Sequence, residues 1–252
     1  MRPYTLASVN NLALVLRERG KYKEAEQMKS DFVSFATHQL RTPLAGIKWM
    51  LELAQAPDLP EDVTSYIQDA RASADRLIRL VNELLDASRL ESGRLALKLE
   101  PANLDATTKD VVDELLPLAT EKGLRLAVES TGPVPRVQAD VKLLREVVLN
   151  LLSNAIRYTL SGGTISIRME HDGAMVRWSV SDTGIGIPAA AHARLFEKFF
   201  RADNASVVHT EGTGLGLYLV RLIIERSGGQ VGCTSVEGKG STFNFTLPLA
   251  GK

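Results

Sequence analysis

Two long apolar stripes in the first third of the chain most constrain its fold. The first stripe advances in steps of three and four residues through Thr37, Leu40, Leu44, Ile47, Leu51 and Ala54. The second, within residues 61–91, has the same spacing through Ile67, Ala70, Ala74, Leu77, Val81, Leu84 and Ser88. This is the spacing of helices in a bundle, and a proline-rich turn at residues 56–60 separates them. One antiparallel helical hairpin leaves much of both stripes exposed, so we expect a homodimer in which two hairpins form a four-helix bundle.

A single histidine lies at the edge of the first stripe. His38 comes one residue after the stripe position Thr37, so its imidazole is expected to face solvent. Thr42 follows four residues later and shares the helix face of His38. Pro43 removes a backbone donor inside the helix, so a bend is expected just after His38.

The segment His38–Leu44, HQLRTPL, resembles the phospho-acceptor box of dimeric sensor histidine kinases of two-component systems. The resemblance implies that His38 is phosphorylated on a ring nitrogen and that Thr42 positions water when a partner is dephosphorylated. An imidazole suits this role because its neutral form is a nucleophile near pH 7. The family most often has an acid after the histidine, whereas here Gln39 can orient the ring but cannot accept its proton.

Composition narrows the possible partners and the compartment. The chain has 252 residues, 44% of them apolar, with 30 basic and 30 acidic side chains. This balance does not indicate nucleic acid or an anionic membrane as a partner. Apolar runs are far shorter than the ~18 residues of a membrane span, and no signal peptide is visible. Cys233 is the only cysteine, so no internal disulfide can form, and we expect a cytoplasmic protein.

From Arg94 onward the periodicity changes and predicts an α+β arrangement. Leu95, Leu97 and Leu99 alternate with polar residues as in a strand. Further strands are expected at 124–128, 164–170, 174–181, 230–235 and 241–248, and helices at 104–122, 140–158 and from 216. Because strands and helices are mixed without a βαβ repeat, we expect an α/β sandwich rather than a doubly wound sheet.

Polar side chains gather on one face of the expected helix 140–158. Asn150, Asn154, Arg157 and Tyr158 are spaced by four, three and one residues. Residues on the opposite face form an apolar stripe, namely Leu143, Val147 and Leu151. The spacing fits both a ligand-binding face and the polar side of an ordinary amphipathic helix.

Two further strings follow the strand expected at 174–181. Asp182, Gly184 and Gly186 form a DxGxG turn whose glycines allow a close backbone approach to a ligand, although such strings are often only turns. Lys198 and Arg201 lie in the segment LFEKFFR and are candidates for contacts with phosphate or with the helical bundle.

A glycine-rich string opens the last expected helix. It reads Gly212-Thr213-Gly214-Leu215-Gly216-Leu217, and free backbone N–H groups at a helix start favour phosphate. The preceding polar segment, residues 202–211, is expected to form a lid over a nucleotide.

These four strings resemble the ATP-binding domain shared by histidine kinases, gyrase, the Hsp90 chaperone and MutL. The resemblance implies ATP and Mg²⁺ as cofactors, with Asn154 as the Mg²⁺ ligand and Asn150 supporting it. It implies that Arg157 meets phosphate, Tyr158 lies near the base or sugar, and Asp182 recognises adenine.

The combined strings predict three domains and one main function. Residues 1–29 resemble a single tetratricopeptide repeat and are either the remnant of a longer array or a signal-input element. Residues 30–93 are expected to form the dimerisation and phosphotransfer domain, and 94–252 the catalytic ATP-binding domain. The expected activity is ATP-dependent autophosphorylation of His38, followed by transfer to an aspartate of a response-regulator receiver domain. The alternatives are an ATPase clamp of the gyrase or Hsp90 type and a catalytically impaired dimeric scaffold.

Overall fold

The computed structural model describes residues 40, 42–52, 63–92, 95–130, 132–171, 173–208 and 212–251. Several sequence predictions lie outside these residues, namely those on the segment 1–29, on His38 and Gln39, and on the turn at 56–60. The chain divides into two compact units, residues 1–80 and 81–252, with the division inside one long helix.

In the first unit, residues 42–52 are helical, and the long helix α2 (Val63–Glu91) begins there and ends in the second unit. These helices confirm the helical prediction for both apolar stripes over the described residues. Large apolar side chains on them are exposed, among them Leu44, Trp49, Leu51, Ile67 and Ile78. No helix in the described part of the chain is both long and apolar enough to cross a membrane.

The remaining elements of the second unit follow in mixed order. They are β1 (Glu100–Ala102), α3 (Leu104–Glu121), β2 (Arg125–Ser130), β3 (Val137–Ala139), α4 (Val141–Tyr158), β4 (Thr164–His171), β5 (Met175–Asp182), the 3-10 helix η1 (Ala189–Arg194), α5 (Asp203–Val208), α6 (Gly216–Arg226), β6 (Gln230–Val236) and β7 (Gly240–Pro248). This arrangement confirms the α+β class predicted from the sequence.

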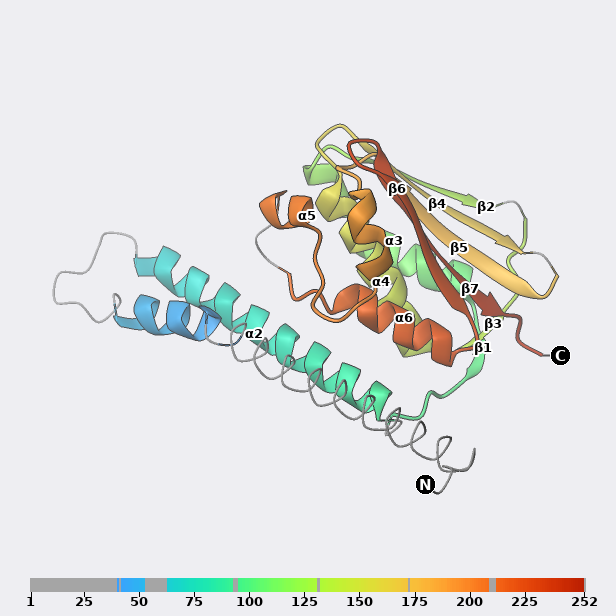
Figure 1. Ribbon diagram of the computed structural model, residues 1–252, viewed down its shortest axis with the longest axis horizontal. Coiled ribbons are helices and arrows are strands. Elements are labelled where there is room, and N and C mark those ends of the chain that lie inside the picture. The colour runs from blue at the N-terminus through green and yellow to red at the C-terminus, as the bar shows by residue number, and fades with distance from the viewer. Residues whose placement is uncertain are drawn as a thin grey trace, which may run out of the picture. The chain divides into compact units, whose positions relative to one another are not determined.

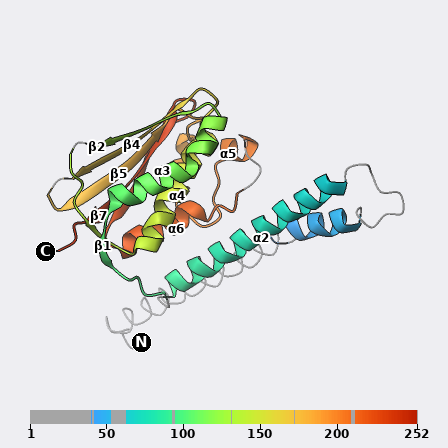
Figure 2. The ribbon, with the colours of Figure 1, turned by 180° about the vertical axis from the view of Figure 1, so that it is seen from behind.

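A five-stranded sheet organises this unit. Its strand order is β2-β4-β5-β7-β6, with β2 parallel to β4 and the other neighbours antiparallel. Helices α3, α4 and α6 cover one face of the sheet in both views (Figures 1 and 2). Side chains alternate between buried and more exposed along β4 and β7, as expected for strands with one face against helices.

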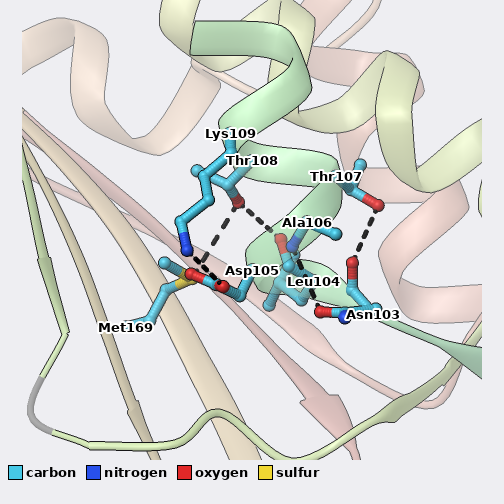
Figure 3. A network of polar contacts seen from close by, with 8 residues as sticks. All are labelled: Asn103, Leu104, Asp105, Ala106, Thr107, Thr108, Lys109 and Met169. Carbon is cyan, nitrogen blue, oxygen red and sulfur yellow. Dashed lines mark hydrogen bonds and ion pairs between the residues drawn. The ribbon is translucent and has the colours of Figure 1, made fainter.

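The core between sheet and helices centres on Trp178. Its ring stacks on Phe245 with centroids 5.2 Å apart, and its Nε1–H donates to Thr108 Oγ1 at 3.0 Å. Thr108 in turn donates to the Leu104 carbonyl at 2.7 Å, one turn earlier in α3 (Figure 3). Asn103 caps the same helix by accepting from the Ala106 N–H (Figure 3). The buried indole N–H therefore has its acceptor.

The strand expected from Arg94 is displaced. Residues 96–99 have no regular structure, and the short strand β1 begins only at Glu100. β1 pairs with β3, a strand that the sequence did not predict. The N–H of Lys98 instead donates to Asp140 Oδ2 at 3.1 Å, so this segment is held by a side chain and not by a strand partner.

Candidate functional site

Helix α4 supplies the first part of the candidate site. The Asp140 carboxylate caps its start by accepting from the N–H groups of Lys142 and Leu143. Val147 and Leu151 are buried on the core face. On the predicted polar face, Asn150, Asn154 and Tyr158 are partly buried and Arg157 is exposed, so three of these side chains lie at the boundary between core and solvent.

The DxGxG turn lies directly against the end of α4. The Ile185 N–H donates to the Tyr158 carbonyl at 3.1 Å, which joins the two predicted motifs through their backbones. A Cβ at Gly184 would stand 2.7 Å from Asp182 Oδ1 and would also collide with the Tyr158 carbonyl. Glycine is therefore required here by the closeness of α4 and not by φ.

The backbone of the turn holds the Asp182 carboxylate on one side. Asp182 Oδ1 accepts from the Gly184 N–H at 2.8 Å and from the Ser241 N–H at 3.3 Å. Burial raises the pKa of Asp182, and these two donors oppose the shift. Both backbone donors recorded among the described residues go to Oδ1, so Oδ2 keeps its acceptor capacity for a ligand.

The turn is also attached to β6 and to the lid region. Gly186 has φ 62°, and a side chain there would collide with the Val236 carbonyl. Asn204, in α5, donates from Nδ2 to the Gly186 carbonyl at 2.9 Å. The segment 202–208 of the predicted lid therefore contains a short helix that contacts the DxGxG turn, whereas 209–211 are outside the described residues.

The glycine-rich loop returns to α4. A Cβ at Gly216, the first residue of α6, would stand 2.7 Å from Asn150 Oδ1. Thr213 Oγ1 accepts from the Leu215 N–H at 3.2 Å, which turns the loop into the helix. The amide oxygen of Asn150 thus lies at the start of α6, where backbone N–H groups favour anions.

The segment LFEKFFR packs beside this loop. Phe199 has φ 62°, and its N–H donates to the Gly214 carbonyl at 3.0 Å. Arg201 donates from a guanidinium nitrogen to the Gly212 carbonyl at 3.3 Å. Both contacts hold the cationic segment against the glycine-rich loop.

Helix α2 contributes two carboxylates, Glu83 and Glu91, that sequence reasoning did not single out. Thr213 donates to Glu83 Oε2 at 2.5 Å, and Lys198 Nζ lies 2.5 Å from Glu91 Oε1. Tyr218, in the first turn of α6, donates its O–H to Glu91. No local pattern marks these contacts, because they join residues more than a hundred positions apart.

The described residues therefore bring together all predicted nucleotide-site strings, whereas the predicted phospho-acceptor His38 lies outside the described part of the chain. Asn150, Tyr158, Gly184, Gly214 and Gly216 are linked by direct contacts. Thr42 is helical and exposed in the first unit. Chemically, the site offers a carboxylate for an amine, amide oxygens for a hard cation and a helix start for phosphate.

Two family models match the chain. The model described as "His Kinase A (phospho-acceptor) domain" matches residues 28–93. The model described as "Histidine kinase-, DNA gyrase B-, and HSP90-like ATPase" matches residues 139–251. The second match contains every nucleotide-site string of the sequence.

Relatives with curated names cover nearly the whole chain. The sensor protein GacS of Pseudomonas syringae pv. syringae is 37% identical over 96% of this chain, which spans 27% of GacS. The histidine-protein kinase BarA of Escherichia coli strain K12 is 33% identical over 96% of this chain, again 27% of the relative. The chain thus spans about a quarter of the length of these relatives.

Solved structures of two other proteins resemble the fold. Full-length ShkA in complex with AMPPNP is 36% identical, with a TM-score of 0.67 over 87% of this chain and 46% of that one. The catalytic domain of histidine kinase ThkA is 30% identical, with a TM-score of 0.54 over 60% of this chain and 96% of that domain. ThkA in complex with the response regulator TrrA is 25% identical, with a TM-score of 0.72 over 93% of this chain and 66% of that one.

Proposed function

Because the chain belongs to the sensor histidine kinases, we propose that it transfers the γ-phosphoryl group of ATP to His38 and then to a response regulator. The observation that carries the proposal is the convergence of Asp182, Asn150 and the start of α6 in one site. The match of residues 28–93 to a phospho-acceptor domain supports His38 as the acceptor.

Adenine recognition is assigned to Asp182. Its Oδ1 is engaged by two backbone N–H groups, so Oδ2 accepts a hydrogen bond from the adenine amino group. The glycines 184 and 186 keep this backbone close to α4 and β6, where side chains would collide. Tyr158 is assigned to the base or sugar, since its own carbonyl anchors the turn.

The triphosphate is assigned to the start of α6 and to nearby cations. The backbone N–H groups at the start of α6, just after Gly212, Thr213 and Gly214, favour a bound phosphate, as at other helix starts. The remaining members of the proposed set are Arg157, Lys198, Arg201, Leu215, Gly216 and Leu217. Arg201 already contacts the Gly212 carbonyl, which supports its place beside the loop.

The residues present fit a magnesium ion. Asn150 Oδ1 lies only 2.7 Å from where a Cβ at Gly216 would stand, so an amide oxygen is next to the start of α6, the phosphate end of the proposed site. Asn154, one turn later on α4, is the proposed ligand, with Asn150 in support. A Mg²⁺ ion held by these residues would offset the negative charge of the triphosphate.

The proposed transfer forms a bond between phosphorus and a ring nitrogen of His38. The bond between the γ-phosphorus and the bridging oxygen breaks, and ADP leaves with its electron pair. Gln39 orients the ring, and the ring proton passes to solvent because an amide cannot accept it. Catalysis rests mostly on positioning and charge neutralisation. A receiver aspartate then takes the phosphoryl group from the histidine, and Thr42 positions water when that aspartate is dephosphorylated.

The proposed partners are a second copy of this chain and a receiver domain. Trp49, Ile67 and Ile78 are each more than half exposed on the helices of the proposed bundle, which suits burial against a second hairpin. ThkA, a structural relative, is solved in complex with a response regulator. The proposed domains are 30–93 for dimerisation and phosphotransfer and 94–252 for catalysis, with 1–29 as an input remnant and the protein in the cytoplasm.

Replacement of His38 tests the proposal. The variant His38→Gln keeps a polar side chain but has no nucleophilic ring nitrogen, so transfer of ³²P from γ-labelled ATP should be lost. Its affinity for AMPPNP should equal that of the unaltered chain, because the proposed nucleotide site lies elsewhere. Label retained in the variant would refute the assignment of His38.

Two further outcomes would identify the alternatives. Steady release of phosphate from ATP without any labelled protein would indicate an ATPase clamp. Nucleotide binding without hydrolysis or label would indicate an impaired scaffold, in which Gln39 fails to replace an acid.

A further inference from the structure

Two carboxylates on one face of α2 contact the residues proposed to hold the triphosphate. Glu83, Ala87 and Glu91 are spaced by four, so they share a helix face and the two carboxylates are ~12 Å apart along the axis. Between them Ala87 is 2% exposed, and Leu90 beside them is fully buried. All of these residues belong to the compact unit 81–252. We call Glu83 and Glu91 the carboxylate pair.

Glu83 holds the hydroxyl of the glycine-rich loop. Thr213 Oγ1 donates to Glu83 Oε2 at 2.5 Å and accepts from the Leu215 N–H. A hydroxyl has one proton, so Thr213 cannot donate to a phosphate oxygen while it donates to Glu83. The negative charge of Glu83 also lies beside the start of α6, where a polyanion is expected.

Glu91 holds residues on both sides of the same loop. Its carboxylate contacts Lys198 Nζ at 2.5 Å and accepts from the Tyr218 O–H. The Lys198 and Glu91 side chains are 28% and 34% exposed, so solvent screens this pair less than a pair on the open surface. Lys198 Nζ also lies 5.2 Å from the Tyr218 ring centroid, and Arg226 donates to the Glu91 carbonyl at 3.4 Å.

Tyr218 is the buried partner of Glu91 in this contact. It is 6% exposed, and the Arg221 guanidinium lies 5.3 Å from its ring centroid. Burial and the neighbouring Glu91 raise the pKa of Tyr218, so its O–H remains a donor at all physiological pH values. Glu91 therefore has one charged and one neutral donor at the edge of the glycine-rich loop.

From these contacts we propose that the carboxylate pair and the triphosphate of ATP compete for Thr213 and Lys198. The end of α2 thereby acts as an autoinhibitory contact that sets nucleotide affinity. A movement of α2 that withdraws Glu83 and Glu91 frees both donors and removes two negative charges from the phosphate site. This inference rests on the proposed nucleotide site, since it assigns a regulator to that site.

Charge-neutral variants test the competition. Glu83→Gln and Glu91→Gln keep size and hydrogen-bonding capacity but remove the charge. Each should tighten binding of Mg²⁺·AMPPNP to the full chain by about threefold, and the double variant by more, in titration calorimetry. The control Glu129→Gln breaks a 3.0 Å ion pair with Arg168 on the sheet and should leave affinity unchanged.

The outcomes separate this inference from the proposed function. If the unaltered chain binds no nucleotide, the proposed function fails. If it binds but the Gln variants bind equally or more weakly, the carboxylate pair positions the donors or is only structural, and the competition is refuted.

Hydrogen exchange tests the same point without substitution. Saturation with Mg²⁺·AMPPNP should speed amide exchange over residues 81–91 of the unaltered chain, because nucleotide displaces the carboxylate contacts. Unchanged or slower exchange over these residues would contradict the competition even if the variants fail to fold.

Discussion

The Ile185 N–H donates to the Tyr158 carbonyl at 3.1 Å, and this bond ties the DxGxG turn to the last turn of α4. The two motifs are separated in the sequence by two strands of the sheet. Their contact fixes the distance between Asp182 and the asparagines of α4. The relative positions proposed for adenine and metal thus depend in part on this backbone contact.

Substitution of Gly184 by alanine should disturb that contact. Its Cβ would stand 2.7 Å from Asp182 Oδ1 and would collide with the Tyr158 carbonyl, so the turn must move away from α4. We expect ATP affinity to fall by at least about tenfold, since the adenine acceptor is displaced. Calorimetric titration with AMPPNP measures it. Gly251→Ala, where a Cβ meets nothing within 4 Å, is the matched control and should bind normally.

Asp182→Asn should weaken ATP binding while the DxGxG turn keeps its two backbone hydrogen bonds. The two backbone donors keep the amide oxygen at the Oδ1 position, which leaves the amide NH₂ facing the adenine amino group. Two donors then oppose each other, and ATP affinity should fall by at least about tenfold. Binding of ATP by the variant with unaltered affinity would show that Asp182 does not recognise adenine.

The same variant has a defined pH dependence. Burial raises the folded-state pKa of Asp182 above its usual 3.8, so the folded chain retains this proton more strongly than the unfolded chain. The stability contributed by this proton is complete below pH 3.8 and is lost as pH rises through the folded pKa. As pH rises through this range, the unfolding free energy of Asp182→Asn should therefore increase relative to that of the unaltered chain. Urea unfolding of both chains at several pH values measures this change. A difference in unfolding free energy that stays constant with pH would contradict the prediction.

Part of this site could be predicted from the sequence. Helical and strand periodicities predicted α2, α3, α4, α6 and most of the sheet, because one face of each element packs on the core. The strand β3 was missed since three residues carry no period, and the strand expected at 95–99 was displaced because Asp140 holds Lys98. The contacts of Glu83 and Glu91 were not predictable, because they depend on tertiary packing and not on local pattern.

Cys233 should react slowly with alkylating reagents. Burial, and secondarily the charge of Asp182, raise its pKa to about 12, and only the thiolate is nucleophilic. Since it is the only cysteine, iodoacetamide labelling reports it without ambiguity. Native protein at pH 8 should label much more slowly than protein unfolded in urea, and Asp182→Asn should label faster than the unaltered fold. Equal rates for native and unfolded chains would contradict the burial argument.

Thr108→Val should destabilise the fold without affecting the nucleotide site. The variant has nearly the same shape but leaves the fully buried Trp178 N–H without its acceptor. We expect a loss of about 1–3 kcal/mol in unfolding free energy and a clear fall in Tm. Differential scanning calorimetry measures it, and AMPPNP affinity below the transition should not change. The control Ser179→Ala removes only a 3.3 Å surface bond to the Arg168 carbonyl and should be nearly neutral.

The most direct test is to locate the phosphoryl group. The full chain is incubated with γ-labelled ATP and Mg²⁺, and the labelled residue is mapped by peptide fragmentation under mild alkaline conditions that preserve phosphohistidine. We expect acid-labile, base-stable label on His38, absent from His38→Gln and strongly reduced in Asn154→Ala. Label on a serine, threonine or another histidine, or ATP consumption with no labelled residue, would contradict the account.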